Sequence, residues 1–226
     1  MTNHASFTNL KMKYRIPMCV AVQLENTASR ARMWLPLPVT KERFAESLGR
    51  IGAARSDFTV ADYGVVAPYI SVYKLMRTPL ANVNHLASRL NKLDSFDVMK
   101  LCAINNTDMY FDGVARLIEF TYNTGDYTLF PGITDEEMLG EYHIGNPKQY
   151  VGGVPLKQHI NRREFGRKIA ELENGVFSPF GYVMAKNGWD NFRVTPRPVP
   201  ESLNLKGSIG EDVYGNYKEK DYDYGV

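Results

Sequence analysis

Residues 108–143 form the most acidic part of the chain and read DMYFDGVARLIEFTYNTGDYTLFPGITDEEMLGEYH. They carry eight acidic side chains against the single base Arg116, a net charge of −7, whereas the whole chain of 226 residues carries +2 and the remainder therefore +9. We call these acids the acidic strip: Asp108, Asp112, Glu119, Asp126, Asp135, Glu136, Glu137 and Glu141. The rest of the sequence is expected to form a frame that presents them.

The same stretch predicts a helix, a strand and a second helix in that order. Residues 111–122 have apolar side chains at helical spacing. That buried side would contain Phe111, Val114, Ala115, Ile118 and Tyr122. Residues 126–130 (DYTLF) predict a strand that a Pro-Gly pair ends. Thr134 with Glu137 then fits a capping box, which predicts the start of the second helix.

Upstream of the strip, the sequence predicts a small sheet with one helix. Apolar residues alternate along 14–24 and 31–35, and residues 57–65 (DFTVADYGV) are typical of a third strand. Thr40 is placed to cap a short helix between the second and third strands. The apolar face of that helix would contain Phe44, Leu48 and Ile51.

Between this sheet and the strip, the spacing predicts a succession of short helices. Thr78-Pro79 is typical of a helix start, with a cap followed by proline at the first helical position, and leucines then recur up to Leu90. Ser95 is placed to cap a shorter helix. Together with the helix over 111–122, these segments predict a helical bundle and not a strand–helix–strand unit.

Downstream of the strip, the sequence predicts one more helix and a strand. Asn161 with Glu164 caps the helix, and residues 174–175 (Asn-Gly) end it. Its buried face is expected to contain Phe165, Ile169 and Leu172. Residues 176–185 then predict a strand.

These patterns predict an α+β molecule of three small subdomains. They are an N-terminal α+β domain (1–72), a helical middle domain (73–123) and a C-terminal α+β domain (124–195). Residues 196–226 are rich in Tyr, Asp, Glu and Lys without an apolar period, and we expect them to form a flexible tail.

The sequence lacks the motifs that carry most enzymatic chemistry. It has no phosphate-binding glycine motif, nucleophile elbow, HExxH or paired-cysteine knuckle. His143 near Glu141 is the one enzymatic alternative, as an acid–base pair. We therefore expect a protein that is not an enzyme and holds no metal or cofactor.

The cysteine and hydropathy patterns predict an intracellular protein. Cys19 and Cys102 lie far apart without metal-ligand spacing, which favours two buried thiols in a reducing compartment. No run of about 18 apolar residues predicts a membrane span. The N-terminus lacks the apolar core of a signal peptide.

Two explanations fit the acidic strip. On a helix, Asp108, Asp112 and Glu119 can share one exposed stripe, where residues three or four apart lie about 5–6 Å from each other. Successive phosphates on one DNA strand are spaced on a similar scale, with one charge per about 1.7 Å of duplex axis when both strands are counted. Alternatively, Arg116 lies within reach of two of these acids, and the stripe is an ordinary salt-bridged solvent face. Residues 135–137 also fall in a first helical turn, where the helix dipole favours acids in any protein.

Several stretches resemble the ArdA family of antirestriction proteins, which inhibit type I restriction-modification enzymes. They are LPLPVTKERFAESLGRIG, DFTVADYG, LANVNHLASRLNKLDSFDVMKL, GVARLIEFTYNTGDYTLFPGITDEEMLGEYHI and REFGRKIAELENGVFSPFGYV, which together cover about residues 35–183.

The resemblance implies an elongated, three-domain α+β dimer whose carboxylates imitate bent B-form DNA. The strip acids fall where this family has phosphate mimics, residues 111–122 fall at its antirestriction motif, and Asp57 and Asp62 lie in the matching first-domain segment. It further implies a phage or mobile-element protein in the bacterial cytoplasm. Its expected partner is a host restriction-modification or CRISPR complex, with no direct binding to DNA.

The chain departs from that family in charge, because ArdA proteins are acidic throughout. Here the N-terminal part contains Lys11, Lys13, Arg15, Arg30 and Arg32. Either the mimicry is confined to the strip, or the protein is directed at another nucleic-acid-handling complex, such as a CRISPR effector. The alternative function is nucleic-acid binding by the basic helix 161–174, through Arg162, Arg163, Arg167 and Lys168.

Overall fold

The protein is mixed α+β, as predicted, and divides into two compact units. The computed structural model describes residues 20–54, 57–65, 70–107, 111, 113–145, 150–151, 154–155, 160–189 and 197–205. The first unit comprises Met1–Leu93, Asp112–Thr121 and Thr195–Val226, and the second comprises Asp94–Phe111 and Tyr122–Val194. The segment predicted as a helical middle domain, 73–123, is thus divided between the two units.

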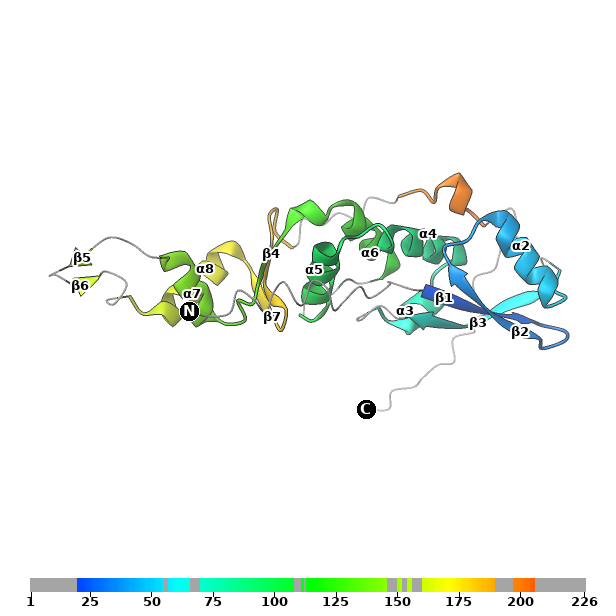
Figure 1. Ribbon diagram of the computed structural model, residues 1–226, viewed down its shortest axis with the longest axis horizontal. Helices are drawn as coiled ribbons and strands as arrows, with labels where there is room; N and C mark the ends of the chain where they lie inside the picture. Colours follow the sequence, from blue (N-terminus) through cyan, green and yellow to red (C-terminus); the bar gives the residue numbers. More distant parts are fainter. Residues whose placement is uncertain are drawn as a thin grey trace, which may run out of the picture. The chain divides into compact units, whose positions relative to one another are not determined.

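An antiparallel three-stranded sheet, in the order β2-β1-β3, forms one part of the first unit. Its strands are β1 (Val20–Asn26), β2 (Arg32–Leu37) and β3 (Phe58–Val65), and helix α2 (Lys41–Arg50) packs against one face (Figure 1). Phe44 of α2 meets Phe58 edge-to-face, with ring centroids 5.6 Å apart. The Thr40 side chain accepts a hydrogen bond from the Arg43 amide, which confirms the predicted cap. The second strand was expected over 31–35, but β2 extends to Leu37 and includes Pro36, which an edge strand tolerates.

Helices form the other part of the first unit. They are α3 (Val72–Met76), α4 (Leu80–Leu90), α6 (Val114–Tyr122) and the 3₁₀ helix η3 (Glu201–Leu203). The predicted cap at Thr78 was wrong, because its hydroxyl donates to the Lys74 carbonyl, 2.8 Å away, in the short helix α3. Asn84, fully buried on α4, donates to the carbonyls of Val39 and Leu203 and accepts from the Val39 amide at 2.8 Å.

Residues 197–205 pack on the first unit, although we expected them to belong to a flexible tail. Leu205 is fully buried, and Lys41 forms an ion pair with Glu201. Arg197 is bonded to the buried carboxylate of Glu119. The packing of this segment could not be predicted from local sequence patterns, because its contacts are with residues far away in the sequence. Residues 196 and 206–226 of the predicted tail lie outside the described residues.

The second unit combines a three-stranded antiparallel sheet, in the order β4-β8-β7, with helices. Its elements are α5 (Ser95–Asn105), η1 (Thr124–Asp126), β4 (Tyr127–Pro131), α7 (Glu136–Ile144), β5 (Tyr150–Val151), β6 (Val154–Pro155), α8 (Arg162–Glu173), β7 (Val176–Ser178) and β8 (Gly181–Ala185). The cap of α5 is Asp94 and not Ser95, because the Asp94 carboxylate accepts two backbone amides. Residues 176–185 form a hairpin and not one strand, with Gly181 at φ 138°.

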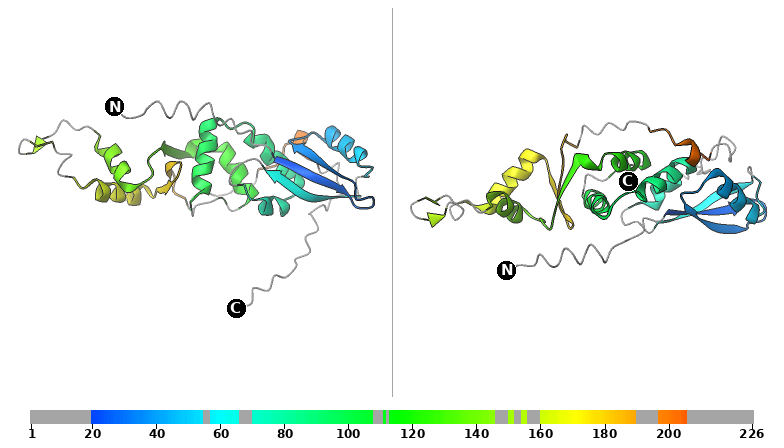
Figure 2. Two further views of the ribbon diagram at one scale, coloured as in Figure 1. Left: turned by 60° about the horizontal axis from the view of Figure 1, so that its bottom comes forward. Right: turned by 45° about the horizontal axis from the view of Figure 1, so that its top comes forward.

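Helices α7 and α8 pack side by side through backbone contact at two glycines (Figure 2). A Cβ on Gly166 would lie 1.8 Å from the Glu136 carbonyl oxygen, and a Cβ on Gly140 would lie 2.0 Å from the Arg162 carbonyl oxygen. The predicted buried face of α8 was therefore wrong in part. Phe165 is 36% exposed and Leu172 is 86% exposed, because the face that contains Gly166 meets α7.

Candidate functional site: the acidic strip

The acidic strip is divided between the two units. Asp108 and Asp112 lie outside the described residues. Glu119 belongs to the first unit, and Asp126 with the four acids at 135–141 belongs to the second.

Glu119 was expected on an exposed stripe, but its side chain is only 6% exposed. Its two carboxylate oxygens accept hydrogen bonds from Arg197 Nε and Nη2, at 2.9 and 3.0 Å. Two parallel N–H···O bonds of this kind hold a carboxylate strongly. Glu119 thus ties residues 197–205 to α6, and its charge is not presented to a partner. Arg116, which was expected to form an ion pair with Glu119, is exposed on the same helix.

Asp126 ends the 3₁₀ helix η1 immediately before β4, and its side chain is half-buried. Its backbone carbonyl accepts a hydrogen bond from the Lys186 amide at 2.9 Å, just after β8. This contact fixes the place where β4 begins. The carboxylate lies at the margin of the surface and adds less accessible charge than an exposed acid would.

The four remaining acids lie on and just before α7. Asp135 is the N-cap, and its carboxylate accepts the Met138 amide at 2.8 Å. The capping box was therefore assigned one residue too early, at Thr134. Glu137 and Glu141 are both exposed and are four residues apart, so their side chains share one face of the helix. Acids in the first turn are also favoured by the helix dipole.

Basic side chains of α8 accompany these acids. Arg162 Nη1 lies 2.7 Å from a Glu141 carboxylate oxygen, an ion pair whose two side chains are about half exposed. The predicted nucleic-acid-binding residues Arg167 and Lys168 lie 3.8 and 3.4 Å from acids one turn away, Glu171 and Glu164. Exposed pairs of this type contribute about 0.2–1 kcal/mol.

The acidic surplus survives this pairing. Residues 135–145 and 160–174 contain seven acids and four bases, a net charge of −3. The four bases are the predicted set Arg162, Arg163, Arg167 and Lys168, and Arg163 is exposed. The α7–α8 pair therefore presents more negative than positive charge, which favours a basic partner surface over a phosphate backbone.

The structure does not place Glu141 and His143 as an acid–base pair. Residues two apart on a helix point to different sides. The Glu141 carboxylate is held by Arg162, whereas the His143 ring lies beside Phe130, with centroids 6.5 Å apart. The arrangement of Glu141 and His143 therefore does not support the catalytic alternative.

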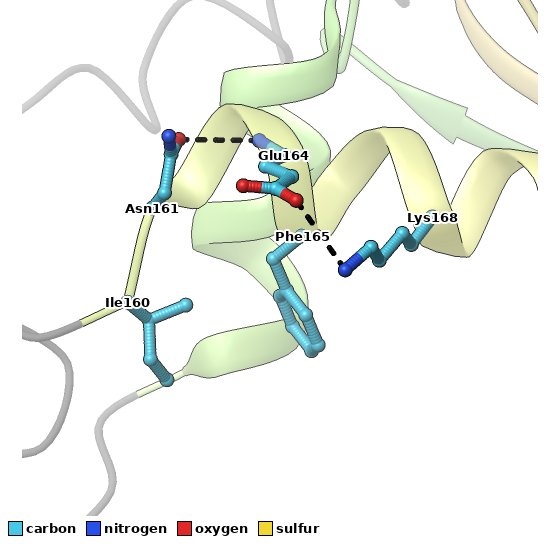
Figure 3. A pocket seen from close by; sticks show the side chains of 5 residues that line it. All are labelled: Ile160, Asn161, Glu164, Phe165 and Lys168. Atoms are coloured by element: carbon cyan, nitrogen blue, oxygen red, sulfur yellow. Dashed lines mark hydrogen bonds and ion pairs between the residues drawn. The ribbon is translucent and has the colours of Figure 1, made fainter.

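An open hollow at the start of α8 is too small for a typical ligand site (Figure 3). Its volume is about 190 Å³, and its lining consists of Ile160, Asn161, Glu164, Phe165 and Lys168. The Asn161 side chain accepts the Glu164 amide at 3.2 Å, which confirms the predicted cap. Small-molecule pockets are usually about 300–1,000 Å³.

Comparison with known proteins leaves the family unassigned. No protein-family model matches the chain, and no curated protein matches it. Among the described residues, every helix is too short or too polar to cross a membrane.

Proposed function

We propose that the protein is a non-enzymatic inhibitor, carried by a phage or mobile element, that occupies the DNA-binding surface of a host defence complex. The defence complex is a type I restriction-modification enzyme or a CRISPR effector. The observation that supports this best is the pair Glu137 and Glu141, exposed on one face of α7. The resemblance of residues 35–183 to ArdA proteins supports the same proposal.

The construction of α7 suits carboxylates that must stand in for phosphates. The helix is fixed at its start by the Asp135 cap and along its length by backbone contact with α8 at Gly140 and Gly166. Charges held in place before binding lose little conformational entropy when a partner binds. Binding of such a surface in a groove built for DNA would displace the groove's counterions into solution, so binding weakens steeply with salt.

The proposed contact set is smaller than the acidic strip. It contains Asp135, Glu136, Glu137 and Glu141, and it omits Asp126, which lies before β4 and not on α7. Glu119 is excluded because its carboxylate is buried against Arg197. The mimicry proposed is therefore local to α7, consistent with a chain whose net charge is only +2.

Charge reversal on α7 tests the proposal, and α2 supplies a matched control. Glu137 and Glu141 occupy the second and sixth positions of α7, and Glu42 and Glu46 occupy the same positions of α2. All four side chains are exposed. The double variants E137K/E141K and E42K/E46K thus make the same charge change in equivalent helical positions, one in each unit.

The readout is the plating of unmodified phage on a host with a type I restriction-modification system. Wild type and E42K/E46K should restore plating, whereas E137K/E141K should lose this protection by at least tenfold. Circular dichroism should show that both variants retain their helices. Full protection by E137K/E141K would refute mimicry by α7.

The alternative function, nucleic-acid binding by α8, rests on its four basic residues. Three of them are engaged in ion pairs with neighbouring acids, including Arg162 with Glu141. A gel shift with duplex DNA at low salt separates the two functions. The inhibitor should leave duplex DNA unshifted, and a shift that R163A/R167A abolishes would establish the alternative.

A further inference from the structure

The outer face of the first unit's sheet carries an exposed tryptophan. Along β2, Leu35 and Leu37 are buried toward α2, so Trp34 lies on the opposite face, where it is 47% exposed. Trp34 pairs with Gln23 on β1, and Gln23 in turn pairs with Asp62 on β3. This face uses none of the α7 carboxylates.

The Trp34 indole lies across the sheet. A Cβ added to Gly64 of β3 would be 3.4 Å from Trp34 Cζ3, 3.7 Å from its Cη2 and 3.9 Å from the Cβ of Ala21. Since β1 separates β2 from β3, the ring must cross β1 to reach Gly64. Small residues beneath the ring let it lie close to the backbone. One edge of the indole therefore lies close to the sheet, and about half of the side chain is exposed.

Two arginines of the hairpin that carries Trp34 are held in place by a buried carboxylate, and Arg32 lies two residues before Trp34 on the same face of β2. Glu25 is 4% exposed, and its oxygens accept hydrogen bonds from Arg30 Nη1, at 2.6 Å, and from Arg32 Nε. The arginine side chains themselves remain 76% and 57% exposed. A guanidinium has five N–H donors, so each retains donors for a second anion. Hydrogen bonds from Arg30, and then from Arg32, lower the pKa of Glu25 against the opposing effect of burial.

The turn that carries Arg30 is also fixed. The Asn26 side chain accepts the amides of Ala28 and Ser29, at 2.8 and 3.0 Å, and donates to the Ile51 carbonyl. Arg30 adopts a left-handed conformation with φ 61°, which is uncommon outside glycine. Both guanidiniums are thus held at Glu25, on the hairpin that carries Trp34, before any ligand arrives.

We propose that this face binds single-stranded nucleic acid, with one base stacked on Trp34 and the adjoining phosphates bound by Arg30 and Arg32. Aromatic platforms with flanking cations bind single strands in this way, because every base offers a flat π-face. The exposed Asp62 lies beyond Gln23 from Trp34 and repels phosphate, which keeps the backbone on the arginine side. This activity goes beyond the proposed inhibition. It changes the expectation of no direct DNA binding only for single strands, and duplex DNA is still expected not to bind.

Tryptophan fluorescence tests the proposal directly, since the chain has only two tryptophans. In W189F, Trp34 is the single reporter. Titration with ten-residue oligothymidylate or oligouridylate at low salt should quench its emission to saturation. Stacking contributes about 1–3 kcal/mol per base, so W34L should weaken binding, measured by anisotropy of a labelled oligonucleotide, about 5- to 150-fold. W34F should retain most of the affinity.

Charge variants provide an independent measure. Single-strand binding falls with log salt by about 0.7 per phosphate neutralised. R30A leaves Arg32 to hold Glu25, and should reduce that slope by about 0.7, whereas R43A on α2 should not change it. D62N should tighten binding without any loss of a contact.

Three results would overturn the proposal. They are the absence of Trp34 quenching, equal affinity in W34L and wild type, and unchanged affinity in both R30A and D62N. If W34L loses protection against restriction while the wild type binds no oligonucleotide, the face contacts a protein and the proposal fails. E137K/E141K should still bind oligonucleotide, so the failure of one proposal is distinguishable from the failure of the other.

Discussion

The close contact between α7 and α8 at Gly166 predicts that Gly166→Ala destabilises the protein, whereas the same substitution at Gly49 of α2 stabilises it. In Gly166→Ala, the new Cβ would lie 1.8 Å from the Glu136 carbonyl oxygen and 2.7 Å from the Gly140 amide nitrogen. Ordinary contact begins at 3.4 Å, so the helices must separate by about 1.6 Å. Both neighbours are backbone atoms, and no side-chain rotation can relieve the clash.

Overpacking a close contact costs about 1–3 kcal/mol in the free energy of unfolding. Alanine has a higher helix propensity than glycine, which offsets this cost by about 1 kcal/mol. At a separation this large we expect the upper end, a net loss of about 2 kcal/mol in the free energy of unfolding. Gly49→Ala on α2 is the control, because a Cβ there meets nothing within 4 Å. It should stabilise the protein by about 0.5–1 kcal/mol.

Urea unfolding measures both effects. In a W34F background the fluorescence of Trp189, whose ring lies 6.0 Å from that of Tyr127, reports on the second unit. Circular dichroism follows the helices of both units. Gly166→Ala should lower the midpoint seen by Trp189, and Gly49→Ala should raise the midpoint of the first unit. Equal stabilisation by the two substitutions would show that α7 and α8 do not meet at their backbones.

Three further outcomes are expected. Arg197→Ala removes two hydrogen bonds from a buried carboxylate and should cost about 1–3 kcal/mol in urea unfolding, whereas Lys41→Ala, at an exposed ion pair, should cost less than about 0.5 kcal/mol. Asp135→Ala should cost about 1 kcal/mol and Thr134→Ala much less, since only the former caps α7; the reverse order would restore the capping box. Burial raises the pKa of the Cys102 thiol to about 11, so alkylation at pH 8, followed by mass spectrometry, should be slow until urea unfolds the chain and should accelerate as pH rises toward 11.

Local patterns were sufficient to predict the α+β class and many of its elements. The cap at Thr40, the strand over 58–65 and the cap at Asn161 depend on residues close in sequence, and all three are present. The buried face of α8 was not predictable in this way. Apolar periodicity gives weight to large side chains such as Leu172, whereas the packing partner of α8 selects the face that contains Gly166, the smallest residue available.

The site was less predictable because its electrostatics depend on distant partners. Glu119 is buried against Arg197, 78 residues later, and Glu141 pairs with Arg162 across the α7–α8 contact. A helical stripe in the sequence shows only neighbours three or four residues away. Alternation along β2 indicates that Trp34 points away from the core, but only the register of three strands places its ring over Gly64.

Competition for one binding site on a purified type I restriction-modification complex tests most directly whether α7 stands in for DNA. Labelled protein is bound to the complex, and its anisotropy is followed as duplex DNA is added. We expect the duplex to displace the protein completely, with an inhibition constant equal to the dissociation constant of the restriction complex for DNA. E137K/E141K should bind the complex at least tenfold more weakly than wild type. Simultaneous binding of the protein and duplex DNA to one complex would contradict the mimicry.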